Sequence, residues 1–224
     1  MINKTWLSLA CVLASAAAHG QEFERNYSKY LRPLIFVLPK PPEPSASNPS
    51  RKYVAKVDVL ADGTVQLPVS VEPSEPVMTA EVNDAARFWL FAPGLTKDCK
   101  PGPRSGKVNF EYDTGEGRAW LEFPSQNIND GETFPYEIAN HGDDNLSYPK
   151  QEAKKGIDHG TVTIAFKILP DGSSTEQVVF IAVPNSKGFI ETALRGSRTI
   201  SVRFKEPIDR PFLCALTPYN FILK

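Results

Sequence analysis

Few residues of this chain have the types and spacing that could support chemistry. The run His141-Gly142-Asp143-Asp144 places one imidazole beside two carboxylates, which are groups that bind metal ions. Carboxylates beside a single histidine are common on polar loops, so we expect no metal site here. Asp158 and His159 stand just before a predicted strand, where a turn explains them better than an acid–base pair.

No catalytic motif accompanies these residues. The chain has no Gly-x-Ser-x-Gly elbow, no His-Glu-x-x-His zinc helix and no glycine-rich loop for phosphate. We therefore expect a protein that is not an enzyme and that uses no cofactor. An enzyme of unrecognised type stays open as an alternative, and it would require His141, His159 and acidic residues to meet at one cleft.

Export is predicted from the first twenty residues. Lys4 is followed by the apolar run 6–14 and then by Ala18-His19-Gly20, small residues of the kind that signal peptidase recognises. We expect a signal peptide over 1–20, cleavage before Gln21 and a periplasmic protein. The alternative is an inner-membrane anchor that faces the periplasm, although a spanning helix needs about 20 apolar residues. A lipid anchor through Cys11 is not expected.

Removal of this segment leaves two cysteines, Cys99 and Cys214. An even number in an oxidising compartment predicts a disulfide between them. Two free buried thiols, or pairing with another chain, stay open. The absence of a Cys-x-x-Cys pair favours a structural bond over a redox-active one.

Charge and composition exclude some classes of protein. The net charge is −1, which gives no basic face for nucleic acid. The chain is 41% hydrophobic, enough for a packed core. Its 20 prolines cluster, and those within 39–44 predict an extended spacer in the segment 21–50. The apolar run 34–38 before them could be an edge strand.

A first set of elements follows over 51–113. Alternating apolar residues predict a strand at 53–59, the Asp62-Gly63 pair predicts a hairpin turn, and a return strand is expected over 65–71. Pro68 indicates an edge or a bulge there. A helix with one apolar stripe and a third strand at 108–112 complete the set; the stripe is Val82, Ala85, Ala86 and Trp89.

The same order recurs over 146–224. A strand at 162–168, the Asp171-Gly172 turn, a strand at 178–183, a helix around 190–197 and a terminal strand at 219–223 follow one another. The two turns lie 109 residues apart, which indicates an internal duplication. Between the sets, 114–145 is expected to be a connecting segment, mostly loop, with one extra strand at 119–123. The predicted fold is α+β: two tandem β-β-α-β modules, each a small antiparallel sheet covered by one helix.

The second module resembles the C-terminal domain of TonB. The resemblance is carried by Tyr148-Pro149, by the run from Gly160 to Gly172 that ends in Asp-Gly, and by Ala193-Leu194 and Arg203-Phe204. In that family a Tyr-Pro pair precedes a short helical segment, which 151–157 matches here. The first module keeps Asp62-Gly63 and an aromatic helix end but lacks the Tyr-Pro pair.

The resemblance implies a function in binding. TonB domains bind a short extended peptide of outer-membrane transporters by adding it to a sheet edge. By this resemblance the expected partner-binding residues are those at the start of the second module and on its last strand: Tyr148, Pro149, Tyr219, Asn220, Phe221, Ile222 and Leu223. The expected partner is an envelope or outer-membrane protein with a peptide like the TonB box.

Two alternatives stay open. The modules could pack edge to edge and form a structural envelope protein, because sheet edges are either used or protected. If the N-terminal segment is not cleaved, the chain could instead be a membrane-anchored energy transducer. The sequence does not indicate the oligomeric state.

Overall fold

Short antiparallel strands and three helices form the part of the chain that the computed structural model describes, which is residues 34–40, 43, 51–112, 117–124, 136–142 and 146–223. The α+β class is as predicted. Within these ranges, no helix combines the length and apolar character needed to cross a membrane. The predicted signal peptide, most of the proline-rich spacer, Asp143 and Asp144 lie outside the described residues.

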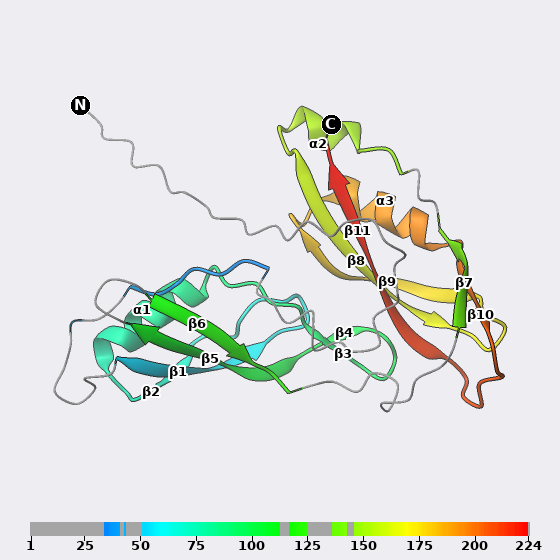
Figure 1. Cartoon of the computed structure of the whole chain (residues 1–224). Coiled ribbons are helices and arrows are strands. Elements are labelled where there is room, and N and C mark those ends of the chain that lie inside the picture. The colour runs from blue at the N-terminus through cyan, green and yellow to red at the C-terminus, as the bar shows by residue number, and fades with distance from the viewer. Residues whose placement is uncertain are drawn as a thin grey trace.

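The first sheet has four strands in the order β2-β1-β5-β6. These are β2 (Ser70–Glu72), β1 (Lys52–Val59), β5 (Arg104–Tyr112) and β6 (Gly117–Glu122). Helix α1 (Pro76–Ala86) follows β2 and packs its apolar side chains into the same core. The fourth strand, β6, forms in the predicted connecting segment, and it extends the sheet beyond the three strands that the sequence predicted (Figure 1).

Two elements of this half are shorter than predicted. The return strand spans only β2, because the chain at Pro68 leaves the ladder and Leu67 is 39% exposed rather than buried. The helix ends at Ala86, and Trp89 is buried just beyond it.

The run 34–38 makes only a single bridge, from Ile35 to Leu90. The Trp89 indole donates to Val37 O at 2.7 Å and fixes this run to the core.

The second sheet has three strands in the order β11-β8-β9. They are β11 (Leu213–Ile222), β8 (His159–Ile168) and β9 (Ser174–Val183). Helix α3 (Lys187–Ser197) covers one face of this sheet, and the short helix α2 (Lys150–Lys154) lies beside α3 (Figure 1). The buried stripe of α3 is formed by Phe189, Thr192, Ala193, Gly196 and Ser197.

Two further small sheets were not predicted from the sequence. Strand β7 (Tyr136–His141) lies where loop was expected and pairs with β10 (Ile200–Phe204), which follows α3. A minimal hairpin joins β3 (Gly94–Leu95) to β4 (Pro101–Gly102). Cys99 lies at the tip of this hairpin and is 1% exposed.

The two halves are joined on the face of the second sheet that α3 does not cover. Ala92 of the first half forms a small buried cluster with Ala165 of β8 and Phe180 of β9. The Cys99–Cys214 disulfide lies at the same junction, with a Cα–Cα distance of 5.2 Å. The predicted bond is therefore present. Cys214 is in strand β11, whereas Cys99 lies in the loop of the β3–β4 hairpin.

Candidate partner-binding edge

The predicted partner-binding residues fall into two groups. Tyr219, Asn220, Phe221 and Ile222 belong to β11, which begins six residues earlier than the predicted terminal strand, and Leu223 follows it. Tyr148 and Pro149 precede α2. Strand β11 ends its sheet, and no strand within the described residues pairs with its outer side. The candidate site is therefore an edge, and its usable backbone groups depend on which residues already bond to β8.

The hydrogen bonds of β11 alternate in direction. Leu223 N donates to Asp158 O at 2.8 Å, and these two residues continue the register of the Ile222–His159 pair. In an antiparallel ladder, hydrogen-bonded pairs alternate with pairs that direct their backbone groups away from each other. The odd-numbered residues of β11 therefore bond to β8. Leu216, Pro218, Asn220 and Ile222 direct their backbone toward the open side.

The side chains of β11 alternate in the same way. Tyr219 and Phe221 face α3: Phe221 is buried and stacks on Phe189 with ring centroids 4.9 Å apart. The even-numbered residues face the opposite side of the sheet. There Ile222 is 69% exposed, whereas Leu216 is packed at the junction of the two halves. The exposed part of the edge is thus its C-terminal end.

The other half of the chain contains the same arrangement with the edge occupied. Val57 pairs with Gly106, and Phe166 pairs with Ala215, so both partners lie 109 residues further along the chain. By this correspondence β5 takes the place of β11. The outer side of β5 pairs with β6 from Lys107–Glu122 to Tyr112–Gly117. The edge that is open in β11 is therefore filled in β5 by a strand of the same chain.

Pro218 distinguishes the two edges. Tyr112 N donates to Arg51 O at 3.2 Å, so the odd-numbered residues of β5 direct their backbone to β6. Among them Asn109 pairs with Trp120. Pro218 occupies the corresponding place in β11 and has no N–H to donate. Proline within a sheet is confined to such outward positions. Pro218 is visible in the sequence as a marker of an edge strand, but the predicted strand began at Tyr219 and did not include Pro218.

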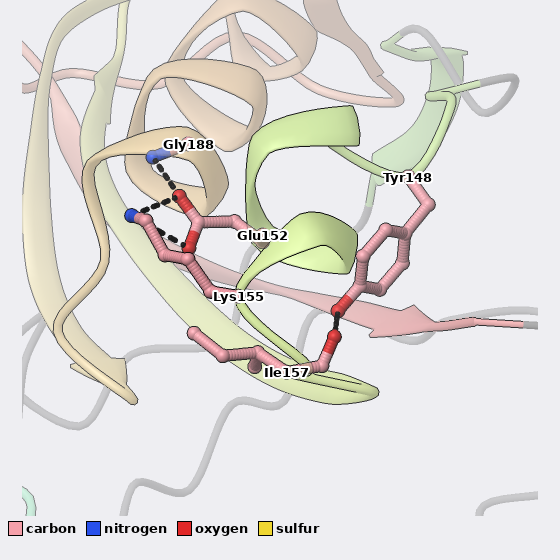
Figure 2. A network of polar contacts seen from close by, with 5 residues as sticks. All are labelled: Tyr148, Glu152, Lys155, Ile157 and Gly188. Carbon is pink, nitrogen blue, oxygen red and sulfur yellow. Dashed lines mark hydrogen bonds and ion pairs between the residues drawn. The ribbon is translucent and has the colours of Figure 1, made fainter.

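The Tyr-Pro pair serves the packing of the second half. The Tyr148 hydroxyl donates to Ile157 O across the turn after α2 (Figure 2). The Tyr148 ring meets the Phe189 ring edge-on, with 5.4 Å between the ring centroids. Phe189 in turn stacks on Phe221. Burial, then the nearby carboxylates of Asp158 and Glu152, raise the pKa of Tyr148. Tyr148 therefore does not contact β11 in this chain of rings directly; the Phe189 ring lies between Tyr148 and Phe221.

A buried carboxylate that the sequence analysis missed holds α2 against α3. Glu152 is 0% exposed, and its Oε1 accepts from Gly188 N at 3.2 Å, with Lys155 Nζ also 3.2 Å from its Oε2 (Figure 2). An anion is favoured at the N-terminus of a helix, where α3 begins. The Ser186 side chain, and then Lys155 and Gly188 N, lower the pKa of Glu152 against the opposing effect of burial.

Of the residues considered for chemistry, the structure describes His141, Asp158 and His159. His159 Nδ1 lies 2.5 Å from Asp158 Oδ1, and both side chains are at least half exposed, as expected for a turn. His141 is exposed at the end of β7. Within the described residues, no three His, Cys, Asp or Glu side chains are grouped so that they could hold a metal ion.

Comparison with known proteins adds no assignment: no protein-family model matches the chain, and no curated protein matches it.

Proposed function

We propose that the chain carries two tandem β-β-α-β modules similar to the TonB C-terminal domain, and that the second module binds an extended segment of an envelope or outer-membrane protein by strand addition. The supporting observation is the difference between two equivalent edges. The outer side of β5 is filled by β6, whereas the corresponding side of β11 carries no strand within the described residues. An unpaired edge of this kind recruits an extended peptide.

The proposed role is non-catalytic and periplasmic, and the resemblance to TonB links it to TonB-dependent transport. Three features support the duplication: the shared 109-residue register, the equivalent turns and the matched element order. In the turns, Asp62 accepts from Thr64 N at 2.9 Å and Asp171 accepts from Ser173 N at 2.8 Å. Mass determination of the native protein tests the location, since a mass that begins near Gln21 requires cleavage of the N-terminal segment.

Site-specific crosslinking tests the binding. A photoreactive residue at Ile222 should capture one extended segment of an envelope protein, identified by peptide mapping. The same residue at Phe88, which is 64% exposed in the first half, is the matched control. If position 222 captures no more than position 88, the proposed strand addition is wrong.

A structural role is the second candidate, favoured by the disulfide and the apolar junction between the halves. That junction uses the face of the second sheet and reaches β11 at Cys214 and Leu216, whereas Ile222 at the C-terminal end of the same edge is exposed. Hydrogen exchange distinguishes the two functions. Fast exchange of the Asn220 and Ile222 amides in the isolated protein, with slowing when a partner binds, supports strand addition. Slow exchange without a partner supports the structural role.

A further inference from the structure

We infer that the segment recognised by β11 is antiparallel to it and carries uncharged residues opposite Leu216 and Asn220. This inference rests on the proposed function and specifies the chemistry of the partner. It comes from β6, which shows how an added strand sits on the equivalent edge of the same fold, and from the side chains that differ between the two edges.

The charged side chains of β5 that lie beside β6 face side chains of opposite charge on β6. Lys107 lies opposite Glu122, and Glu111 lies opposite Arg118 with 3.9 Å between the Glu111 carboxylate and the Arg118 guanidinium. Directly opposed side chains of unlike charge stabilise an antiparallel pair. The outward positions of β5 thus match the charges of β6.

The corresponding positions of β11 are uncharged. Leu216 stands in the place of Lys107, Pro218 in that of Asn109, and Asn220 in that of Glu111. A strand with the charges of β6 would set its glutamate against Leu216 and its arginine against Asn220, where neither gains a partner. Ile222, 69% exposed, and Leu223, 45% exposed, extend this uncharged edge with apolar surface. These side chains favour a partner segment that is uncharged and partly aliphatic.

Pro218 sets the centre of the pairing. A partner residue opposite Pro218 can donate to its carbonyl but receives no bond in return. On the exposed side of Pro218, Asn220 and Ile222 offer hydrogen bonds in both directions. On the other side the backbone of Leu216 does the same, while its side chain is packed at the junction of the two halves. The recognised segment therefore spans Pro218 with one unpaired carbonyl.

Two synthetic peptides test this inference on the full chain. The first is the β6 sequence Gly-Arg-Ala-Trp-Leu-Glu-Phe, and the second replaces its Arg by Val and its Glu by Thr. With each cross-strand pair contributing about 0.5 kcal/mol, the uncharged peptide should bind about fivefold more tightly in calorimetry. Its binding should slow hydrogen exchange at the Asn220 and Ile222 amides.

A charge placed on the protein provides the reciprocal test. Asn220→Glu restores the charge of Glu111 at an exposed position and should abolish the preference, so that the two peptides bind about equally tightly, because the gain opposite position 220 offsets the difference that remains opposite Leu216. Thr199→Glu adds the same charge at an exposed turn before β10 and should leave the preference unchanged.

The outcomes separate the inference from the proposed function. Binding at β11 with no preference between the peptides, or an unchanged preference in Asn220→Glu, overturns the inference alone. Protection of β5 amides in place of β11 amides also overturns it. If neither peptide binds at β11 and the photoreactive residue at position 222 captures no envelope segment, the proposed strand addition fails as well.

Discussion

Asn109 and Pro218 occupy the same position in the two sheets of this protein, each with its backbone directed away from the first strand of its half. Asn109 is paired with Trp120 of β6, whereas Pro218 lies on an edge without a strand partner among the described residues. A proline at this point interrupts the row of donors that promotes pairing between unrelated chains. The edge that we propose for binding is therefore also protected against indiscriminate pairing.

Replacement of Pro218 should increase self-association. Pro218→Thr supplies the missing N–H and a residue favoured in strands. Each restored ladder bond is worth about 1 kcal/mol, and a symmetric dimer gains two, so the dimerisation constant should rise roughly tenfold or more. Sedimentation at several concentrations measures it. Pro211→Thr, at an exposed position before β11, is the control and should stay at the wild-type value.

Loss of the disulfide should destabilise the whole fold. The bond joins residues 115 positions apart, and the chain-entropy model gives such a bond about 4 to 5 kcal/mol. We expect the double variant Cys99→Ser and Cys214→Ser to lose at least about 2 kcal/mol in urea unfolding. The reduced wild-type protein should match it. Identical unfolding of the oxidised and reduced proteins would contradict this prediction.

Two glycines should respond differently to alanine. Gly172 (φ +83°) and Gly156 (φ +72°) both have left-handed backbone, which costs alanine about 1 to 2 kcal/mol. A Cβ on Gly172 would also lie 1.8 Å from Val202 O, whereas one on Gly156 has no atom within 4 Å. Gly172→Ala should therefore lower the free energy of unfolding in urea by more than about 3 kcal/mol, and Gly156→Ala should lower it by about 1 kcal/mol. Equal losses would show that backbone conformation alone decides.

The stability of the protein should decrease in acid, partly through Glu152. The pKa of this carboxyl is lowered below its ordinary 4.5 in the folded protein. The unfolded chain therefore binds a proton first as the pH falls, so the stabilisation present above pH 4.5 is lost as the pH passes through the folded pKa. Glu152→Gln should flatten this part of the dependence of the free energy of unfolding on pH. If the free energy of unfolding of Glu152→Gln depends on pH as it does in the wild-type protein, Glu152 does not contribute to the loss of stability in acid.

The amino-acid sequence by itself determined the local elements. Asp62-Gly63 and Asp171-Gly172 specify their turns because glycine accepts the left-handed backbone and the aspartate side chain bonds to the residue two positions on. Alternation in 53–59 and 162–168 specifies strands with one buried face. The two remaining cysteines indicated their bond. Each of these signals lies within a few residues of the feature that it predicts, or follows from a count.

Only the tertiary structure decided which strands meet. The pairing of β7 with β10 joins segments about 60 residues apart. Apolar and polar residues alternate in β10, but that alternation does not indicate which distant segment pairs with it. Likewise β6 alone does not indicate that it fills the edge of β5, nor does β11 alone indicate that its outer side bears Pro218. These outcomes depend on long-range register, in which a shift of one residue reverses every side chain. The candidate edge is thus a property of the assembled sheets, whereas the strand that forms it was visible in the sequence.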